Sequence, residues 1–509
     1  MKIVEKYLQM PDEIKLYTRI IIPDGVDKCP LIFIRTPYEK ALAESPLCPQ
    51  KYETNIFLDA GYALVYQHCR GTGESEGECI PYKNEREDGL FTLEYIRTLD
   101  FYNGEIYLMG GSYLSSAHLL YIADKPKDIK GAVLEIQTDR MYYRNYMNGC
   151  NYNFCNAEWW IGMMKRKYPN PDFTNLRQRP YIDIDKRAVG EEIPSLRELF
   201  INNEYNDFWK NDSRTDVMDA IDFPILFVEG WYDFYIGGMF SMWERMPENS
   251  KRRSSFIVGP WGHAVKTDES YDYKKLNNGN LPNDYALEWF ESIREKREYR
   301  YAKTGAVKYY SIGSDTWKYG NCQTKSRNFL DLCLSELSFC GKNDVFEYEY
   351  DPDNPPLIFT KRGLWESKIP LESKGVKSFY TDEFQDECSF YGVIDCDLSV
   401  SSDSEDTAFY VCINLVTEGK AYPLTEAISS LSCFCKDYIP GEKVKLHIST
   451  NPIAFSLKRG DKLRIDIASC GGKYIPHSNQ KEHWALCRDS RIAHNKVYLD
   501  ESGIHIPQI

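Results

Sequence analysis

Short apolar runs alternate with longer amphipathic segments from the N-terminus to residue 305. The apolar runs are nearly continuous in hydrophobicity and lie at 31–34, 63–66, 105–109, 132–136, 225–228 and 255–258. Such runs are typical of buried strands in a parallel sheet that is covered on both faces. The segments at 90–99, 117–123 and 285–298 have helical spacing. The alternation of the two kinds predicts a doubly wound α/β domain.

Two regions depart from this rhythm. Residues 140–217 are rich in Tyr and Trp, with helical patches and no convincing strand, which predicts a helical cap over the carboxyl edge of the sheet. From 306 onward, starting with the run at 307–310, polar and apolar residues alternate between turns rich in Asp, Pro, Gly and Ser. That pattern predicts an all-β sandwich or jelly roll over 306–509. The α/β domain would then comprise 1–139 and 218–305.

Composition and charge narrow the class of protein. Hydrophobic residues make up 42% of the 509 residues, which is enough for a packed core and excludes a disordered chain. The net charge is −14, so the chain lacks the excess of basic residues that binding to duplex nucleic acid requires. No run of apolar residues is long enough for a transmembrane helix, and the N-terminus has no apolar signal segment. We therefore expect a cytoplasmic protein with neither a nucleic-acid nor a membrane partner. The sequence does not distinguish a monomer from a homo-oligomer.

The cysteines do not form a recognisable metal or disulfide pattern. All 16 are scattered, without a C-x-x-C pair. In a chain of this size they are expected to be mostly reduced and buried as small apolar side chains. No metal-ligand spacing occurs, so we expect no metal and no organic cofactor.

A serine stands where one predicted strand turns into a helix. The strand at 105–109 runs directly into Gly110-Gly111-Ser112-Tyr113, followed by helical spacing. This is the nucleophile-elbow arrangement, in which a sharp turn presents the serine hydroxyl above the sheet. A side chain at Gly110 would collide with the following helix, and the Tyr113 N–H would face an oxyanion. The strict G-x-S-x-G pattern fails, because Leu114 occupies its last position.

An acid and a base follow two later strands. Asp233 comes shortly after the run at 225–228, and His263 shortly after the run at 255–258. Parallel strands bring their carboxyl ends to one edge, so these side chains can meet Ser112 there. The order Ser112, Asp233, His263 is that of α/β hydrolases, which predicts a catalytic triad.

Several ordered motifs resemble one family over nearly the whole chain. They are R-T-P-Y-E-K at 35–40, R-G-T-G-E-S-E-G at 70–77, G-G-S-Y at 110–113, G-W-Y-D at 230–233, G-P-W-G-H at 259–263, and the segments 313–317, 350–355 and 401–403. The chain is thereby similar to the cocaine esterase and X-prolyl dipeptidyl aminopeptidase group of α/β hydrolases, which includes α-amino-acid ester hydrolases and glutaryl acylases. The resemblance implies an α/β-hydrolase domain with an inserted cap and a C-terminal jelly roll. It also implies that the Tyr38 hydroxyl completes the oxyanion hole. Ser115 departs from the glycine of many relatives, and we expect altered packing there.

These observations predict a serine hydrolase that cleaves an ester or amide through an acyl-enzyme. The aromatic cap favours an apolar or aromatic acyl group, with Trp159, Trp160, Trp231 and Tyr232 as candidate pocket residues. We therefore expect a small-molecule acyl esterase. An X-prolyl dipeptidyl aminopeptidase or an α-amino-acid ester hydrolase, acting on a short peptide or amino-acid ester, is the alternative. A catalytically inactive binding protein that uses its β domain is the alternative from another class.

Overall fold

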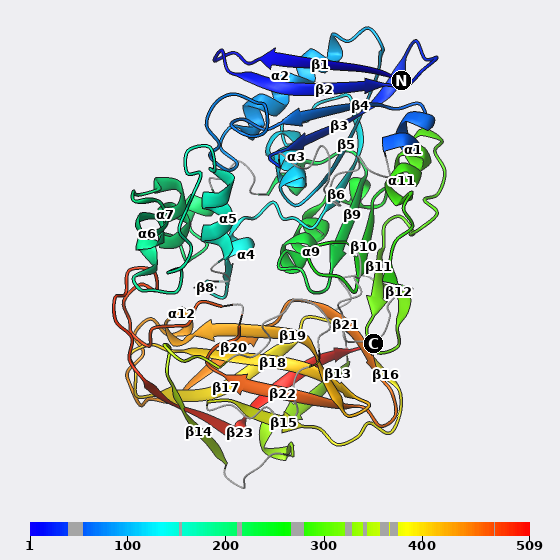
Figure 1. The fold of residues 1–509 in the computed structure, drawn as a ribbon. Helices are drawn as coiled ribbons and strands as arrows, with labels where there is room; N and C mark the ends of the chain where they lie inside the picture. The colour runs from blue at the N-terminus through cyan, green and yellow to red at the C-terminus, as the bar shows by residue number, and fades with distance from the viewer. Residues whose placement is uncertain are drawn as a thin grey trace.

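A computed structural model describes residues 1–38, 54–151, 155–210, 216–265, 279–320, 328–338, 344–356, 366, 375–472 and 474–509. In Figure 1 the α/β domain lies at the top, the cap helices at its side, and the all-β domain below. All six predicted parallel strands are present: β3 (Cys29–Thr36), β4 (Ala63–His68), β5 (Tyr102–Gly111), β6 (Ile129–Glu135), β9 (Ile225–Gly230) and β10 (Ser255–Gly259).

The central sheet contains ten strands, and the six parallel ones occupy its middle in the order β4-β3-β5-β6-β9-β10. One edge is extended by the antiparallel strands β1 (Lys2–Gln9) and β2 (Lys15–Ile22). The other edge is extended by β11 (Val307–Ser311), which pairs in parallel with β10, and by β12 (Thr316–Gly320). The alternating pattern had placed the run at 307–310 with the β domain. Alternation identifies a strand but does not say which sheet it joins.

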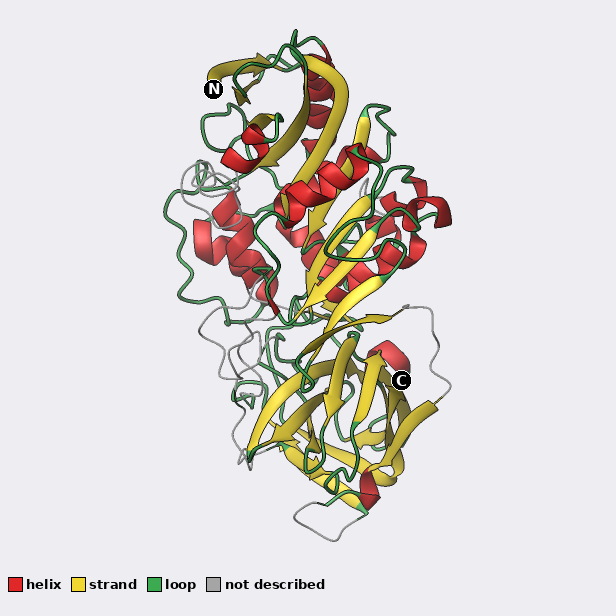
Figure 2. Cartoon of the chain, turned by 90° about the vertical axis from the view of Figure 1, so that its right-hand side faces the viewer, coloured by secondary structure: helices red, strands yellow, loops and turns green. Residues whose placement is uncertain are grey.

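Helices cover both faces of this sheet. On one face α2 (Glu85–Arg97), α3 (Tyr113–Ile122) and α9 (Ile236–Arg245) contribute buried apolar side chains to the core. On the other face α1 (Thr54–Asp59) and α11 (Tyr285–Arg294) do the same. Figure 2 shows these layers from the side. α3 starts earlier than its spacing predicted because all of its residues are buried, so its first turn has no polar face to reveal the period.

The cap is mostly helical, as its pattern predicted. It contains α4 (Tyr142–Asn145), α5 (Cys155–Met163), α6 (Ile184–Val189), α7 (Pro194–Ile201) and α8 (Asp207–Lys210). Two-residue strands β7 (Tyr146–Met147) and β8 (Cys150–Asn151) form a small hairpin that is too short to show a period. The cap core includes Trp160 and Trp209 and also contains Tyr113 of the α/β domain. Two of the aromatic residues in the predicted cap segment, Tyr152 and Phe154, lie outside the described residues.

Among its described residues the C-terminal domain is all-β, with only one-turn helical segments such as α12 (Leu431–Phe434). One of its sheets is built around the long strand β23 (Ala493–Gln508) and the other has the order β15-β22-β18-β19. Besides β23, the strands of the two sheets have the following bounds: β13 (Asn328–Cys333), β14 (Val345–Tyr350), β15 (Lys377–Tyr380), β16 (Cys388–Gly392), β17 (Asp395–Ser402), β18 (Ala408–Thr417), β19 (Lys420–Ser430), β20 (Val444–Ser449), β21 (Ile453–Leu457) and β22 (Lys462–Ala468).

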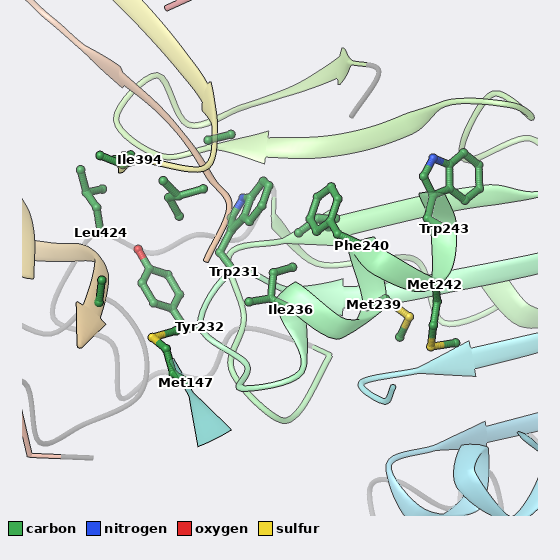
Figure 3. Close-up of a cluster of buried hydrophobic side chains, with 14 of the residues drawn as sticks. Met147, Trp231, Tyr232, Ile236, Met239, Phe240, Met242, Trp243, Ile394 and Leu424 are labelled. Carbon is green, nitrogen blue, oxygen red and sulfur yellow. The ribbon is translucent and has the colours of Figure 1, made fainter. Parts of the chain in front are cut away.

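A continuous hydrophobic core joins the α/β domain to the β domain. Tyr309 of β11 stacks on Tyr391 of β16 with ring centroids 4.4 Å apart. In Figure 3 Tyr232 lies near Met147 of the cap and Leu424 of the β domain, and all three belong to one cluster of buried side chains. The domains are therefore packed against each other rather than linked loosely.

The described residues show neither a disulfide bond nor a membrane-spanning helix. The described cysteines form no disulfide, and most of them are buried. Across the described ranges, no helix combines the length and the apolar character that crossing a membrane would require.

Candidate active site

Ser112 occupies a strained turn between β5 and α3. Its φ of 56° and ψ of −122° are unfavourable for a residue with a side chain. Its backbone N–H donates to the Glu135 carbonyl (3.0 Å), and its own carbonyl accepts from the Gln137 side chain (2.9 Å). These bonds to β6 and the segment after it hold the turn in place, as an elbow that presents a serine requires.

The close approach of strand and helix at this turn depends on Gly110. A Cβ atom at Gly110 would lie 2.6 Å from the Leu114 carbonyl carbon and 2.8 Å from the Ser115 nitrogen. Ser115, which departs from the family pattern, donates its hydroxyl to the Gly110 carbonyl and accepts from the Glu135 N–H (3.1 Å). Its hydroxyl therefore fastens α3 to β5 and β6.

The structure brings Ser112, His263 and Asp233 together from three separate strands. The His263 Nε2 lies 3.0 Å from the Ser112 hydroxyl, and its Nδ1 lies 2.5 Å from the Asp233 carboxylate. The Asp233 side chain is fully buried, whereas that of His263 is 26% exposed. A serine, an imidazole and a carboxylate in this sequence of contacts can generate a nucleophile and return its proton to a leaving group.

Backbone contacts fix the acid and base loops against each other. The Tyr232 N–H donates to the Trp261 carbonyl (2.9 Å), and the Trp231 N–H donates to the Gly259 carbonyl (3.0 Å). The Asp233 carboxylate also accepts from the Tyr235 N–H (2.7 Å). The Phe234 ring stacks on the His263 ring at 4.9 Å. The imidazole is thus held by an aromatic ring against its face as well as by the carboxylate.

Tyr38 lies beside the serine, two residues after the end of β3. Its hydroxyl lies close to the Ser112 hydroxyl and the Trp159 indole, and both groups act to lower its pKa. Burial raises the pKa of the Tyr38 phenol, so the hydroxyl keeps its proton and can donate it to a carbonyl oxygen. Tyr113 begins α3, and an N–H in the first turn of a helix has no partner within that helix. The Tyr38 hydroxyl and the Tyr113 N–H are therefore the candidate donors for an oxyanion hole next to Ser112.

The four candidate pocket residues separate into two pairs. Trp159 lies at the site, because it contacts Tyr38, and Trp160 packs beside it with ring centroids 6.3 Å apart. The structure does not bring Trp231 and Tyr232 to Ser112. Both lie in the hydrophobic core next to the β domain, where the Trp231 indole N–H donates to the Tyr310 carbonyl (2.7 Å). Proximity to Asp233 in sequence was misleading, since the strand–turn geometry points these two side chains into the core.

The residue patterns did not single out Glu229. This carboxyl group is completely buried at the end of β9 and accepts from the Gly230 N–H (2.8 Å). Burial raises the pKa of Glu229 well above its ordinary value, and the nearby Asp233 charge adds to the effect. A carboxyl group whose burial favours the protonated form therefore lies beside the triad carboxylate. The sequence feature that could have identified Glu229 is its position as the one charged residue in an otherwise apolar strand.

Fold and site together define an α/β hydrolase whose sheet presents a serine on a nucleophile elbow. A family model described as X-Pro dipeptidyl-peptidase (S15 family) matches residues 12–265, and the model of the X-Pro dipeptidyl-peptidase C-terminal non-catalytic domain matches residues 306–502. The chain belongs to this S15 family and is a serine hydrolase. This result argues against the alternative of a catalytically inactive binding protein.

Individual relatives agree with this assignment. Cocaine esterase from Rhodococcus sp. (strain MB1 Bresler) is 23% identical over 471 residues, which covers 82% of this chain and 81% of that one. A solved α-amino acid ester hydrolase has a TM-score of 0.81 at 19% identity, covering 100% of this chain and 96% of the other. An aminopeptidase from a Thaumarchaeota archaeon of marine sediment also has a TM-score of 0.81, at 17% identity, covering 99% and 96%. The two structures establish the shared fold.

Proposed function

We propose that the protein hydrolyses small carboxylic esters through an acyl-enzyme formed on Ser112. His263 takes the proton of the Ser112 hydroxyl as its oxygen attacks the ester carbonyl, and then gives that proton to the departing alcohol. Water attacks the resulting acyl-serine by the same route, which releases the acid and restores the serine. Asp233 holds the imidazole in the tautomer that has Nε2 free to accept. The single observation that carries this proposal is the 3.0 Å and 2.5 Å pair of contacts through His263.

Two hydrogen-bond donors stabilise the tetrahedral intermediate in this proposal. The Tyr38 hydroxyl leaves Ser112 and donates to the carbonyl oxygen as it becomes negative, together with the Tyr113 N–H. Removal of one such donor typically lowers kcat by about 10²–10³. The Tyr38→Phe variant is therefore expected to lose about that much of its esterase kcat while it still forms the acyl-enzyme.

The charge around Tyr38 favours a neutral acyl group. A dipeptidyl peptidase or an α-amino-acid ester hydrolase must hold a substrate ammonium, which calls for carboxylates facing the acyl group. The Arg144 guanidinium acts on both Tyr38 and Tyr235, which is a cation close to the site. Trp159 adds an aromatic surface. Glu158, an acidic candidate on the same helix, is exposed.

A substrate panel tests the proposal. We expect p-nitrophenyl butyrate and p-nitrophenyl benzoate to have a higher kcat/KM than phenylalanine p-nitrophenyl ester, which has the same leaving group, and we expect no measurable cleavage of Gly-Pro-p-nitroanilide. Preference for either of the ammonium-bearing substrates would overturn the substrate assignment and favour the alternative activities.

The nucleophile has a separate test. A fluorophosphonate probe should label the wild-type protein and the Ser314→Ala control, whose substitution lies on the turn between β11 and β12, but not Ser112→Ala. Unchanged labelling of Ser112→Ala would refute the mechanism whatever the substrate.

A further inference from the structure

Tyr82 is an aromatic residue held in an unfavourable backbone conformation next to the site. Its φ is 69°, in the left-handed region that bulky residues rarely adopt. Its N–H donates to the Tyr113 hydroxyl (2.9 Å), and its ring stacks on the Tyr113 ring with centroids 4.6 Å apart. A strained residue persists only where the surroundings fix it, and such residues cluster at functional sites.

Tyr113 provides a rigid base for this stack. Its hydroxyl donates to Glu85 Oε1 (2.8 Å), and Glu85 Oε2 lies 2.8 Å from the Arg35 guanidinium. The three side chains are almost completely buried. The Tyr113 phenol therefore uses its one donor on Glu85 and accepts from Tyr82, which leaves the Tyr82 ring little freedom to move.

Arg144 connects this base to Tyr38 from the cap. The guanidinium donates to the Tyr82 hydroxyl (2.8 Å) and lies 4.1 Å from the centroid of the Trp159 ring, a cation–π distance. Trp159 in turn lies next to the Tyr38 hydroxyl, since both residues pack against the same cap cluster and Trp159 acts on the Tyr38 pKa. Since Arg144 lies on α4 and Trp159 on α5, two cap helices are tied to the residue beside the nucleophile.

We propose that Tyr82 and Arg144 are positioning residues that hold Trp159, and through it the Tyr38 hydroxyl, at the place where the oxyanion forms. The inference rests on the proposed role of Tyr38. A donor in an oxyanion hole is effective because it is oriented before the charge develops. Tyr82 gives Arg144 a fixed acceptor, and the flat guanidinium fixes the Trp159 indole by stacking. The Arg144 charge also opposes the rise that burial causes in the pKa of Tyr38, which strengthens its hydroxyl as a donor.

Single variants test whether the chain of contacts affects turnover. Tyr82→Phe removes only the hydroxyl that Arg144 binds, and Arg144→Met removes the charge while keeping a long side chain. We expect each to lower the kcat for p-nitrophenyl butyrate about ten- to a hundredfold, with KM within about twofold, because a misplaced group slows the step without weakening ground-state binding. Arg144→Lys keeps the charge but not the planar fork, so it should recover only part of the loss. Tyr142→Phe is the matched control, since it removes a hydroxyl on the same helix that donates to the Asn203 carbonyl; it should retain wild-type kcat.

The combination with Tyr38→Phe separates this inference from the proposed function. If Arg144 acts through Tyr38, Arg144→Met should slow the Tyr38→Phe enzyme by less than about twofold, and Tyr82→Phe should add nothing to Arg144→Met. Losses that multiply in the Tyr38→Phe background, or a raised KM at unchanged kcat, would overturn the inference and leave the oxyanion role intact. A Tyr38→Phe enzyme with full kcat would overturn both. Tyr82→Phe retains its backbone and ring, so it provides the test if Arg144→Met does not fold.

Discussion

Gly110→Ala tests the elbow geometry directly. The added Cβ would lie 2.6 Å from the Leu114 carbonyl carbon, whereas ordinary contact begins at 3.4 Å. Strand and helix must therefore separate by about 0.8 Å at the residue two positions before Ser112. A displacement of about 1 Å in a reacting group costs about 10² in rate. We expect kcat/KM for p-nitrophenyl butyrate to fall by about that factor, with slower fluorophosphonate labelling.

Gly162→Ala is the control for this experiment. Gly162 lies in α5 of the cap, and a Cβ there meets no atom within 4 Å. That variant should keep wild-type activity and unfold at the same temperature or slightly higher, because alanine favours a helix over glycine. If Gly110→Ala also retains wild-type kcat/KM, the turn accommodates a Cβ atom without displacing Ser112, and the argument that the elbow requires glycine is wrong.

Three further predictions concern residues near the triad. Asp233→Asn should lower kcat by about 10⁴ by favouring the wrong imidazole tautomer, and steady-state ester hydrolysis that falls less than tenfold would contradict it. Because burial raises the pKa of Glu229 above its ordinary value of 4.5, the contribution of this group to the free energy of unfolding falls as the pH rises above 4.5, by up to about 1.4 kcal/mol per pH unit. The gain in Tm from Glu229→Gln should therefore be larger at pH 8 than at pH 5; a gain independent of pH refutes the raised pKa. Trp231→Phe leaves the Tyr310 carbonyl without its indole donor, which should cost about 1–3 kcal/mol of stability and lower Tm at unchanged KM. A shifted KM would favour the pocket role that the sequence suggested.

Much of the architecture follows from local pattern. The strands that carry Ser112, Asp233 and His263 are short apolar runs in order, and parallel pairing puts their carboxyl ends at one edge, so the meeting of the three side chains could be expected. The elbow could also be predicted from the sequence, because a glycine two residues before a serine at a strand–helix junction is typical of it. The structure gives the reason, since a side chain at Gly110 would meet the backbone of the following helix. Tyr38 could be assigned only through resemblance, since nothing in its own spacing distinguishes it from a tyrosine in a turn.

The remainder depends on contacts between distant segments. The direction of the Trp231 side chain is set by the β domain and by Tyr310, 79 residues away. Arg144 and Tyr82 lie 62 residues apart and meet only when the cap folds over α3. Polar–apolar alternation likewise could not say that β11 joins the central sheet, because a strand pattern contains no information about its neighbour.

The pairing of β11 with β10 has a consequence for how the chain can be divided. A fragment that ends at residue 305 would retain Ser112, Asp233 and His263 but would leave one side of β10 without its hydrogen-bonding neighbour. An open strand edge of that kind recruits other chains and promotes aggregation. The strands β11 and β12, which follow residue 305, therefore cover this edge of the catalytic sheet. A catalytic fragment must therefore extend beyond the boundary at residue 305 that the sequence pattern predicted, so that it includes β11 and β12.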